Sequence, residues 1–112
     1  MKIYRYLDRG TIRESSTPPA DAVLLPPCVP TKIVCIGRNF REHAKELGNE
    51  VPVEPLFFLK PSTSVIGDGE PIVLPPQSER VEFEGEIGIV IGSRLSKATE
   101  AQASEGIRGI VA

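Results

Sequence analysis

Three glutamates lie at alternate positions of segment 81–91. In a β-strand, residues two apart point to the same side, so Glu82, Glu84 and Glu86 would line one face at roughly 7 Å from neighbour to neighbour. Like charges at that spacing repel one another unless water screens them or a cation neutralises them. The pattern therefore fits either a solvated strand face or a divalent-cation site. The two glycines among these residues favour the cation site slightly, because close approach of a ligand or a backbone needs small residues.

A histidine and a glutamate stand three positions apart, at His43 and Glu46. The sequence predicts a short helix over residues 39–47, which Asn39 can cap and Gly48 can end. On that helix the imidazole and the carboxylate would share one face. A carboxylate there could orient the ring and raise its basicity, as in a general base that activates water. A surface pair without a catalytic role is the alternative.

Three further polar residues follow or end apolar runs. Arg38 and Asn39 come after the run 32–36, and Lys60 ends the run 55–60. Substrate-binding groups tend to lie at such strand ends and loops, although ordinary surface roles fit these residues too.

The elements that must position these residues are short. A hairpin is expected around Asp8-Arg9-Gly10, formed by residues 2–7 and 10–13, and a Ser- and Pro-rich linker is expected over 15–30. Prolines punctuate the chain after residue 50, which excludes long helices and favours a mainly β (α+β) architecture. The other expected elements are a buried strand over 32–36, strands over 55–60, 72–74 and 81–91, a helix over 96–105 and a strand from 107 to 112.

The composition excludes several classes of protein. The chain has 112 residues, of which 40% are apolar and 25% charged, with a net charge of −2. These values are typical of a globular domain, and no basic stripe points to nucleic acid as a partner. Because the N-terminus has no apolar run that could form a signal or a membrane span, we expect a cytoplasmic protein without a membrane partner.

Three motifs follow one another along the chain. They are Ile36-Gly37-Arg38-Asn39-Phe40-Arg41-Glu42-His43, then Pro55-Leu56-Phe57-Phe58-Leu59-Lys60-Pro61, then Phe83-Glu84-Gly85-Glu86-Ile87. In this order they resemble the fumarylacetoacetate hydrolase family, close to its small bacterial acylpyruvase and 2-hydroxyhepta-2,4-diene-1,7-dioate isomerase type. The resemblance covers residues 24–112, where it implies an incomplete catalytic domain, and the hairpin and linker expected over 1–23 precede it. That domain would be the N-terminal part of a mixed β-sandwich roll with a short lid helix.

The same resemblance implies a divalent cation, Mg²⁺ or Mn²⁺. Glu84 and Glu86 match a Glu-x-Glu pair of ligands, and oxygen ligands suit these hard cations. Glu82 falls outside the motif and is expected to be a solvated neighbour. The family's third ligand, an Asp, is expected beyond residue 112, so the sequence predicts a member truncated at its C-terminus.

The remaining roles are also implied by the resemblance. His43 and Glu46 would form a dyad that deprotonates water, on a helix that acts as a lid. Arg38 and Lys60 match residues that hold the anionic end of the substrate. The partners implied are a small 2-oxo acid and a second copy in a homodimer.

The resemblance implies an enzyme. Three possibilities remain open for this chain. The first is metal-dependent hydrolysis of a C–C bond in acylpyruvate-like 2-oxo (1,3-diketo) acids, in the catabolism of aromatic compounds. The second is decarboxylation or tautomerisation of 2-oxo diacids such as oxaloacetate or 2-hydroxyhepta-2,4-dienedioate. The third is a fragment without catalytic activity.

Overall fold

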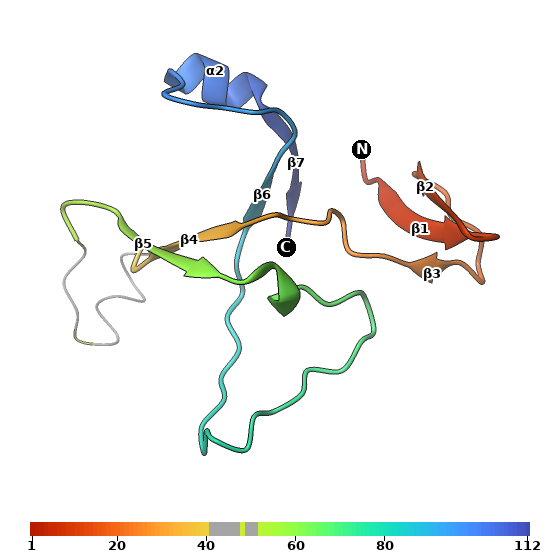
Figure 1. Cartoon of the computed structure of the whole chain (residues 1–112), viewed down its shortest axis with the longest axis horizontal. Helices are drawn as coiled ribbons and strands as arrows, with labels where there is room; N and C mark the ends of the chain where they lie inside the picture. The colour runs from red at the N-terminus through yellow and green to blue at the C-terminus, as the bar shows by residue number, and fades with distance from the viewer. Residues whose placement is uncertain (41–47, 49–51) are drawn as a thin grey trace. The chain divides into compact units, whose positions relative to one another are not determined.

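A computed structural model describes residues 1–40, 48 and 52–112 of the chain (Figure 1). The chain divides into two compact units, residues 1–68 and residues 69–112. The described residues form short antiparallel sheets with one short α-helix, which confirms the mainly β class. Within these residues, no helix has the length and apolar character needed to cross a lipid bilayer.

The first unit begins with the predicted hairpin. β1 (Tyr4–Asp8) and β2 (Thr11–Ser15) pair antiparallel through a turn of two residues. These residues, Arg9 and Gly10, both have a positive φ, of 50° and 80°. Positive φ at both central positions is what a type I′ turn requires, and its twist matches that of the strands on either side. The turn therefore fixes the register of the hairpin locally.

A third strand lies in the segment expected to be a linker. β3 (Val23–Leu24) pairs antiparallel with β1, which becomes the central strand of a sheet in the order β2-β1-β3. The Arg5 guanidinium donates to the Pro26 carbonyl oxygen at 3.1 Å, and the Leu25 N–H donates to the Arg5 carbonyl oxygen at 2.8 Å. The linker interpretation of 15–30 is therefore wrong at these residues, because pairing with an existing strand edge outweighs their weak local preference.

The second sheet of this unit pairs two predicted strands. β4 (Ile33–Gly37) and β5 (Leu56–Lys60) run antiparallel, and a single 3-10 turn, η1 (Ser62–Ser64), follows β5. The expectation that the first of these strands is buried is wrong for the described residues. The side chains of β4 alternate between half-buried and exposed, and those of β5 are exposed. A ribbon of two strands leaves both its faces open unless another layer covers it.

The second unit contains one further ribbon. β6 (Gly88–Ile91) and β7 (Ile107–Val111) pair antiparallel, and the connection between them contains α2 (Glu100–Glu105) (Figure 1). β7 confirms the strand predicted from residue 107. The helix predicted over 96–105 begins later than expected, because Lys97 has a φ of 50°, which an α-helix cannot include.

A capping box marks the start of α2. The Thr99 hydroxyl oxygen accepts from the Gln102 N–H at 3.3 Å, and the Gln102 Oε1 accepts from the Thr99 N–H at 2.9 Å. These reciprocal bonds satisfy two backbone donors that the first turn of a helix leaves without partners.

Two strand predictions in this unit need correction. Residues 72–74 have no regular secondary structure, and only the last four residues of the predicted strand 81–91 pair with another strand. The prolines on both sides of 72–74 have no backbone N–H, so they cannot donate a hydrogen bond to a neighbouring strand. In 81–87 the alternation of side chains fits a strand, but alternation alone supplies no hydrogen-bonding neighbour, and no described strand pairs with this segment.

Gly88 and Gly85 differ in the space around them. A Cβ atom on Gly88 would lie 2.7 Å from the Val111 Cγ2, whereas a Cβ on Gly85 would meet nothing within 4 Å. A side chain at position 88 would therefore require the Val111 side chain to move.

We expect Gly88→Ala to lower the free energy of unfolding by about 1–3 kcal/mol, because the Val111 side chain would have to move. The control is Gly85→Ala, which should change stability by less than about 0.5 kcal/mol. Urea titrations followed by circular dichroism measure both values, and equal effects of the two substitutions would contradict this account of Gly88.

Candidate functional site

A small hollow of about 190 Å³ lies where β4 ends and β5 begins. Arg38 follows the last residue of β4 and has a φ of 56°. This left-handed conformation costs a non-glycine residue roughly 1–2 kcal/mol, and such strain tends to persist where a side chain is held for function. The residues that line the hollow are Ile36, Gly37, Arg38, Asn39, Pro52, Val53, Glu54, Pro55 and Leu56.

The hollow combines groups that can recognise a small anion. The Arg38 guanidinium can bind a carboxylate through two parallel hydrogen bonds, and the Asn39 amide offers further donors and an acceptor. Glu54 also lines the hollow, but its negative charge would repel an anion, so anion recognition rests on Arg38 and Asn39. The volume is below the 300–1,000 Å³ or so of pockets that enclose a drug-sized ligand, so the hollow suits one end of a small molecule.

Lys60 lies at the opposite end of the same ribbon. It pairs with Ile33, whereas Gly37, next to Arg38, pairs with Leu56. At about 3.3 Å per residue, roughly 13 Å of strand separates the two ends. The backbone of the ribbon therefore does not bring Arg38 and Lys60 together into one cluster.

The acidic pair lies in the second unit, just before β6. Glu84 and Glu86 are exposed, and neither belongs to a strand. The neighbouring Glu82 is engaged with Arg80, whose Nη2 lies 2.6 Å from the Glu82 Oε1. That ion pair agrees with the expectation that Glu82 is a surface residue.

The fit of a divalent cation to this pair can be judged from its donors. Carboxylate oxygens are the ligands that Mg²⁺ and Mn²⁺ prefer, so Glu84 and Glu86 have the right chemistry. Among the described residues, however, no group of three or more His, Cys, Asp or Glu side chains could hold a metal ion. The pair can therefore supply part of a coordination shell.

His43 and Glu46, the predicted catalytic dyad, lie outside the described residues. The same holds for the helix predicted over 39–47, apart from its first two positions.

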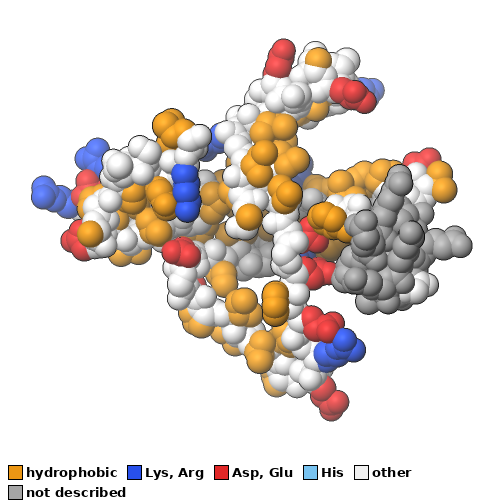
Figure 2. Space-filling model, turned by 180° about the vertical axis from the view of Figure 1, so that it is seen from behind, with side chains coloured by type: hydrophobic (Ala, Val, Ile, Leu, Met, Phe, Trp, Pro, Cys, Tyr) orange, Lys and Arg blue, Asp and Glu red, His pale blue; other side chains and the backbone are white. Residues whose placement is uncertain are grey.

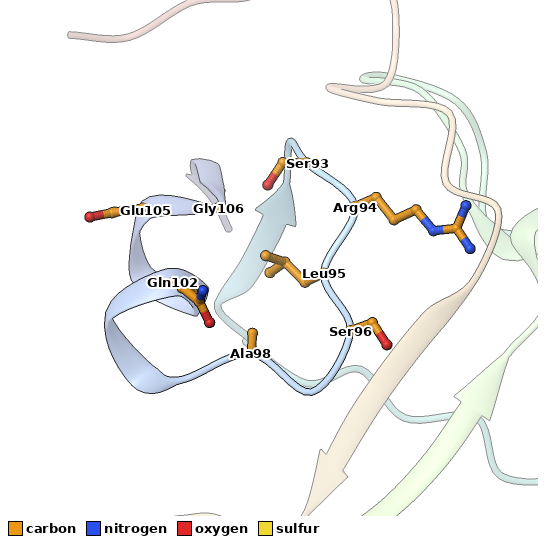
Figure 3. Close-up of a pocket in the computed structure, with 8 residues that line it drawn as sticks. All are labelled: Ser93, Arg94, Leu95, Ser96, Ala98, Gln102, Glu105 and Gly106. Atoms are coloured by element: carbon orange, nitrogen blue, oxygen red, sulfur yellow. The ribbon is translucent and has the colours of Figure 1, made fainter.

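A second hollow, of about 400 Å³, lies between α2 and the loop after β6 (Figure 3). The Leu95 side chain points toward α2, whereas Arg94 points away from the hollow (Figure 3). Gln102 also lines it, but its Oε1 is already engaged by Thr99 in the capping box. Because none of the site residues predicted from the sequence lines this hollow, we do not assign it to the candidate site.

Glu54 is the site residue that reasoning from the sequence missed. The signal was present in the two strands predicted over 32–36 and 55–60. Strands that follow one another along a chain usually pair, and antiparallel pairing puts the residues after the first beside those before the second. This places Glu54 beside Arg38 and Asn39.

The comparisons with known proteins identify the family. Residues 32–112 match the family model described as fumarylacetoacetate (FAA) hydrolase C-terminal, and the chain belongs to this family. The chain is 43% identical over 99 residues to a protein of Mycobacterium tuberculosis, covering 88% of this chain and 37% of that protein. No solved structure matches the chain.

Several relatives carry names that state an activity. A mitochondrial oxaloacetate tautomerase of Caenorhabditis elegans is 46% identical over 79 residues, covering 70% of this chain and 37% of the relative. A mitochondrial oxaloacetate decarboxylase of Dictyostelium discoideum is 55% identical over 64 residues, covering 56% and 29%. The chain thus spans about a third of the length of the curated relatives that it matches.

Replacing Arg38 by glycine should separate stability from binding. We expect Arg38→Gly to raise the free energy of unfolding by about 0.5–1 kcal/mol, because glycine adopts a positive φ without strain. The same substitution should weaken the binding of a dicarboxylate such as oxalate, which loses its guanidinium partner. Urea denaturation and calorimetric titration measure the two effects.

The matched control is Lys97→Gly, since Lys97 also has a positive φ, of 50°, and does not line the hollow. It should stabilise the chain similarly and leave oxalate binding unchanged. Equal losses of oxalate affinity in both variants would show that Arg38 has no specific role.

Proposed function

We propose that this chain contributes the anion-binding and acidic residues of an enzyme that acts on small 2-oxo diacids of the oxaloacetate type. The reaction would be tautomerisation or decarboxylation. The observation that carries this choice is the similarity to relatives named oxaloacetate tautomerase and oxaloacetate decarboxylase, at 46% and 55% identity. The chemistry of Arg38 in its hollow supports the same substrate class, since each end of such a diacid carries a carboxylate.

In this proposal Arg38 donates two hydrogen bonds to one carboxylate of the substrate and orients it. Asn39 can add a donor to the same group. Lys60, at the other end of the ribbon, provides a positive charge for a separate anionic group. Tautomerisation then requires that a proton leaves C3 of the substrate and that the 2-oxo oxygen gains one, and the His43 imidazole is the group of this chain suited to carry it.

Glu84 and Glu86 would hold a divalent cation, Mg²⁺ or Mn²⁺, which are ions that oxygen ligands favour. When bound, such a cation supplies Lewis-acid stabilisation of the enolate charge. The two carboxylates supply negative charge and leave the remaining ligand positions to groups from outside the described residues.

A second candidate function is hydrolysis of the C–C bond of an acylpyruvate. The spacing of His43 and Glu46 favours it, because a carboxylate that orients an imidazole makes a base able to take a proton from water. The two functions differ in how strongly they depend on that base. Hydrolysis needs an activated water molecule, whereas decarboxylation does not.

The acidic pair can be tested by calorimetric titration of Mn²⁺ with oxalate, a mimic of the pyruvate enolate. We expect oxalate to strengthen the binding of Mn²⁺ to the chain, and Glu84→Gln to weaken it by at least about 10- to 100-fold, since it removes a ligand charge. Glu79→Gln, at another exposed glutamate of the same unit, is the control and should leave the affinity unchanged. Unaltered affinity in Glu84→Gln would reject Glu84 as a ligand.

The two reactions can be separated in a chimera in which this chain replaces the matching segment of the M. tuberculosis relative. We expect Glu84→Ala to abolish turnover of oxaloacetate, and His43→Ala to lower oxaloacetate decarboxylation much less than acylpyruvate hydrolysis. Steady-state rates with each substrate measure this difference. Equal loss of both activities in His43→Ala would contradict the expected difference in dependence on the base, and full activity in both variants would refute the proposed site.

The cytoplasmic location, expected from the N-terminal sequence, and the homodimer, implied by the family resemblance, remain predictions. Light scattering of the chimera would measure its oligomeric state.

A further inference from the structure

Two opposite charges line the hollow between the end of β4 and the start of β5. Among the described residues that line it, Arg38 is the one basic residue and Glu54 is the one acidic residue. Asn39 adds an uncharged amide, and the other lining residues are apolar or glycine. An anion that enters this hollow is therefore attracted by one side chain and repelled by another of equal charge.

The same strand pairing positions both charged residues. Gly37 pairs with Leu56, so Arg38 follows directly after one member of this pair and Glu54 stands two residues before the other. Pro55 separates Glu54 from β5, and a proline restricts its own backbone and that of the residue before it. The backbones that carry the guanidinium and the carboxylate are thus held relative to each other by the β4–β5 ribbon.

The walls of the hollow strengthen the effect of these charges. Ile36 and Leu56 line it, each with 47% of its surface exposed. Hydrophobic side chains are exposed along the β4–β5 ribbon (Figure 2). Because apolar walls screen charges less than bulk water does, Arg38 and Glu54 act on a bound group more strongly than they would on a polar surface.

An arginine alone does not distinguish a carboxylate from a phosphate, since a guanidinium binds either group through two parallel hydrogen bonds. A carboxylate carries one negative charge, whereas a phosphate near neutral pH carries roughly 1.5–2. The additional charge strengthens the attraction to Arg38, and repulsion from Glu54 offsets that gain. Because a doubly charged group also loses more hydration on binding, the hollow as a whole favours the carboxylate.

We propose that Glu54 is a specificity-determining residue, which makes the hollow select the carboxylate end of a 2-oxo acid over a phosphate or phosphonate end. The selection depends on charge, and the class of compound that it excludes is small acids that carry a phosphate group. This inference rests on the proposed function in one respect, which is that Arg38 binds an anionic end of the substrate.

The test compares malonate with phosphonoacetate, which has a phosphonate in place of one carboxylate of malonate. Calorimetric titration of each into the chain, at low salt and at a pH where the phosphonate is doubly charged, gives the ratio of their affinities. We expect the unaltered chain to bind malonate at least as tightly as phosphonoacetate. Glu54→Gln should shift the ratio toward phosphonoacetate by roughly two- to fivefold, which is the effect of one charge about 4–8 Å away in solvated surroundings.

Two variants and one change of conditions separate charge from shape. Glu54→Asp retains the negative charge and should keep most of the original ratio. Asp21→Asn removes a charge from an exposed residue of the same unit that does not line the hollow, and it should leave the ratio unchanged. Salt at about 1 M should reduce the shift seen in Glu54→Gln, because the screening length then falls to about 3 Å.

Three results would overturn the proposal. The first is an unchanged ratio in Glu54→Gln, and the second is an equal shift in Asp21→Asn. The third is the absence of malonate binding that Arg38→Gly weakens, which would also remove the anion site from the proposed function. An unchanged ratio in Glu54→Gln beside turnover of oxaloacetate by the chimera would reject this inference alone. Lack of turnover beside the expected shift would reject the proposed reaction alone.

Discussion

Pairing of antiparallel strands, with little burial of their side chains, is the interaction on which the rest of this structure depends. Among the described residues, Tyr6 is the one hydrophobic residue that is buried, with 7% of its surface exposed. Fully burying a side chain such as isoleucine contributes about 1.5–3 kcal/mol, and fixing the backbone of one residue costs about 1–2 kcal/mol. Ribbons whose side chains stay exposed gain little burial free energy to offset that entropy cost. Their stability therefore depends on whether another layer covers them.

The positions of the candidate site residues depend on the ribbons, because these polar residues lie at the ribbon ends. Arg38 follows β4, Lys60 ends β5, and the Glu84 and Glu86 pair precedes β6. Each side chain is positioned by a strand that has only one partner strand in the described structure. How precisely each of these residues is placed therefore depends on how firmly its own ribbon is held.

Local sequence signals predicted the elements that local interactions determine. The β1–β2 hairpin followed from Asp8-Arg9-Gly10, and β4, β5 and β7 followed from runs of β-branched and aromatic residues. The predictions failed where a distant neighbour decides. β3 forms because β1 offers an edge, and the alternation in 81–87 finds no partner strand in the described structure. The start of α2 was predicted too early, because Lys97 adopts a positive φ that is incompatible with a helix, although the residues around it favour one.

The candidate site was predictable to a similar extent. The motifs alone identified Arg38 and Lys60 as residues suited to binding anions, and Glu84 and Glu86 as residues suited to binding cations. The distance between Arg38 and Lys60 depends on strand pairing, which the motifs do not encode. The place of Glu54 follows from the pairing of β4 and β5, which the order of the two predicted strands already indicates, and the distance between Arg38 and Lys60 follows from the same register.

The two-residue turn of the first hairpin has a consequence for the order in which this chain folds. β1 and β2 can pair after a loop of two residues closes. The pairing of β4 with β5 requires closure of the loop 38–55, and the pairing of β6 with β7 requires closure of the loop 92–106. Loop closure costs more entropy as the loop lengthens, and isolated hairpins form within about 1–10 μs. During synthesis the first 24 residues can therefore complete their sheet before the family segment, from residue 32 onward, has emerged from the ribosome.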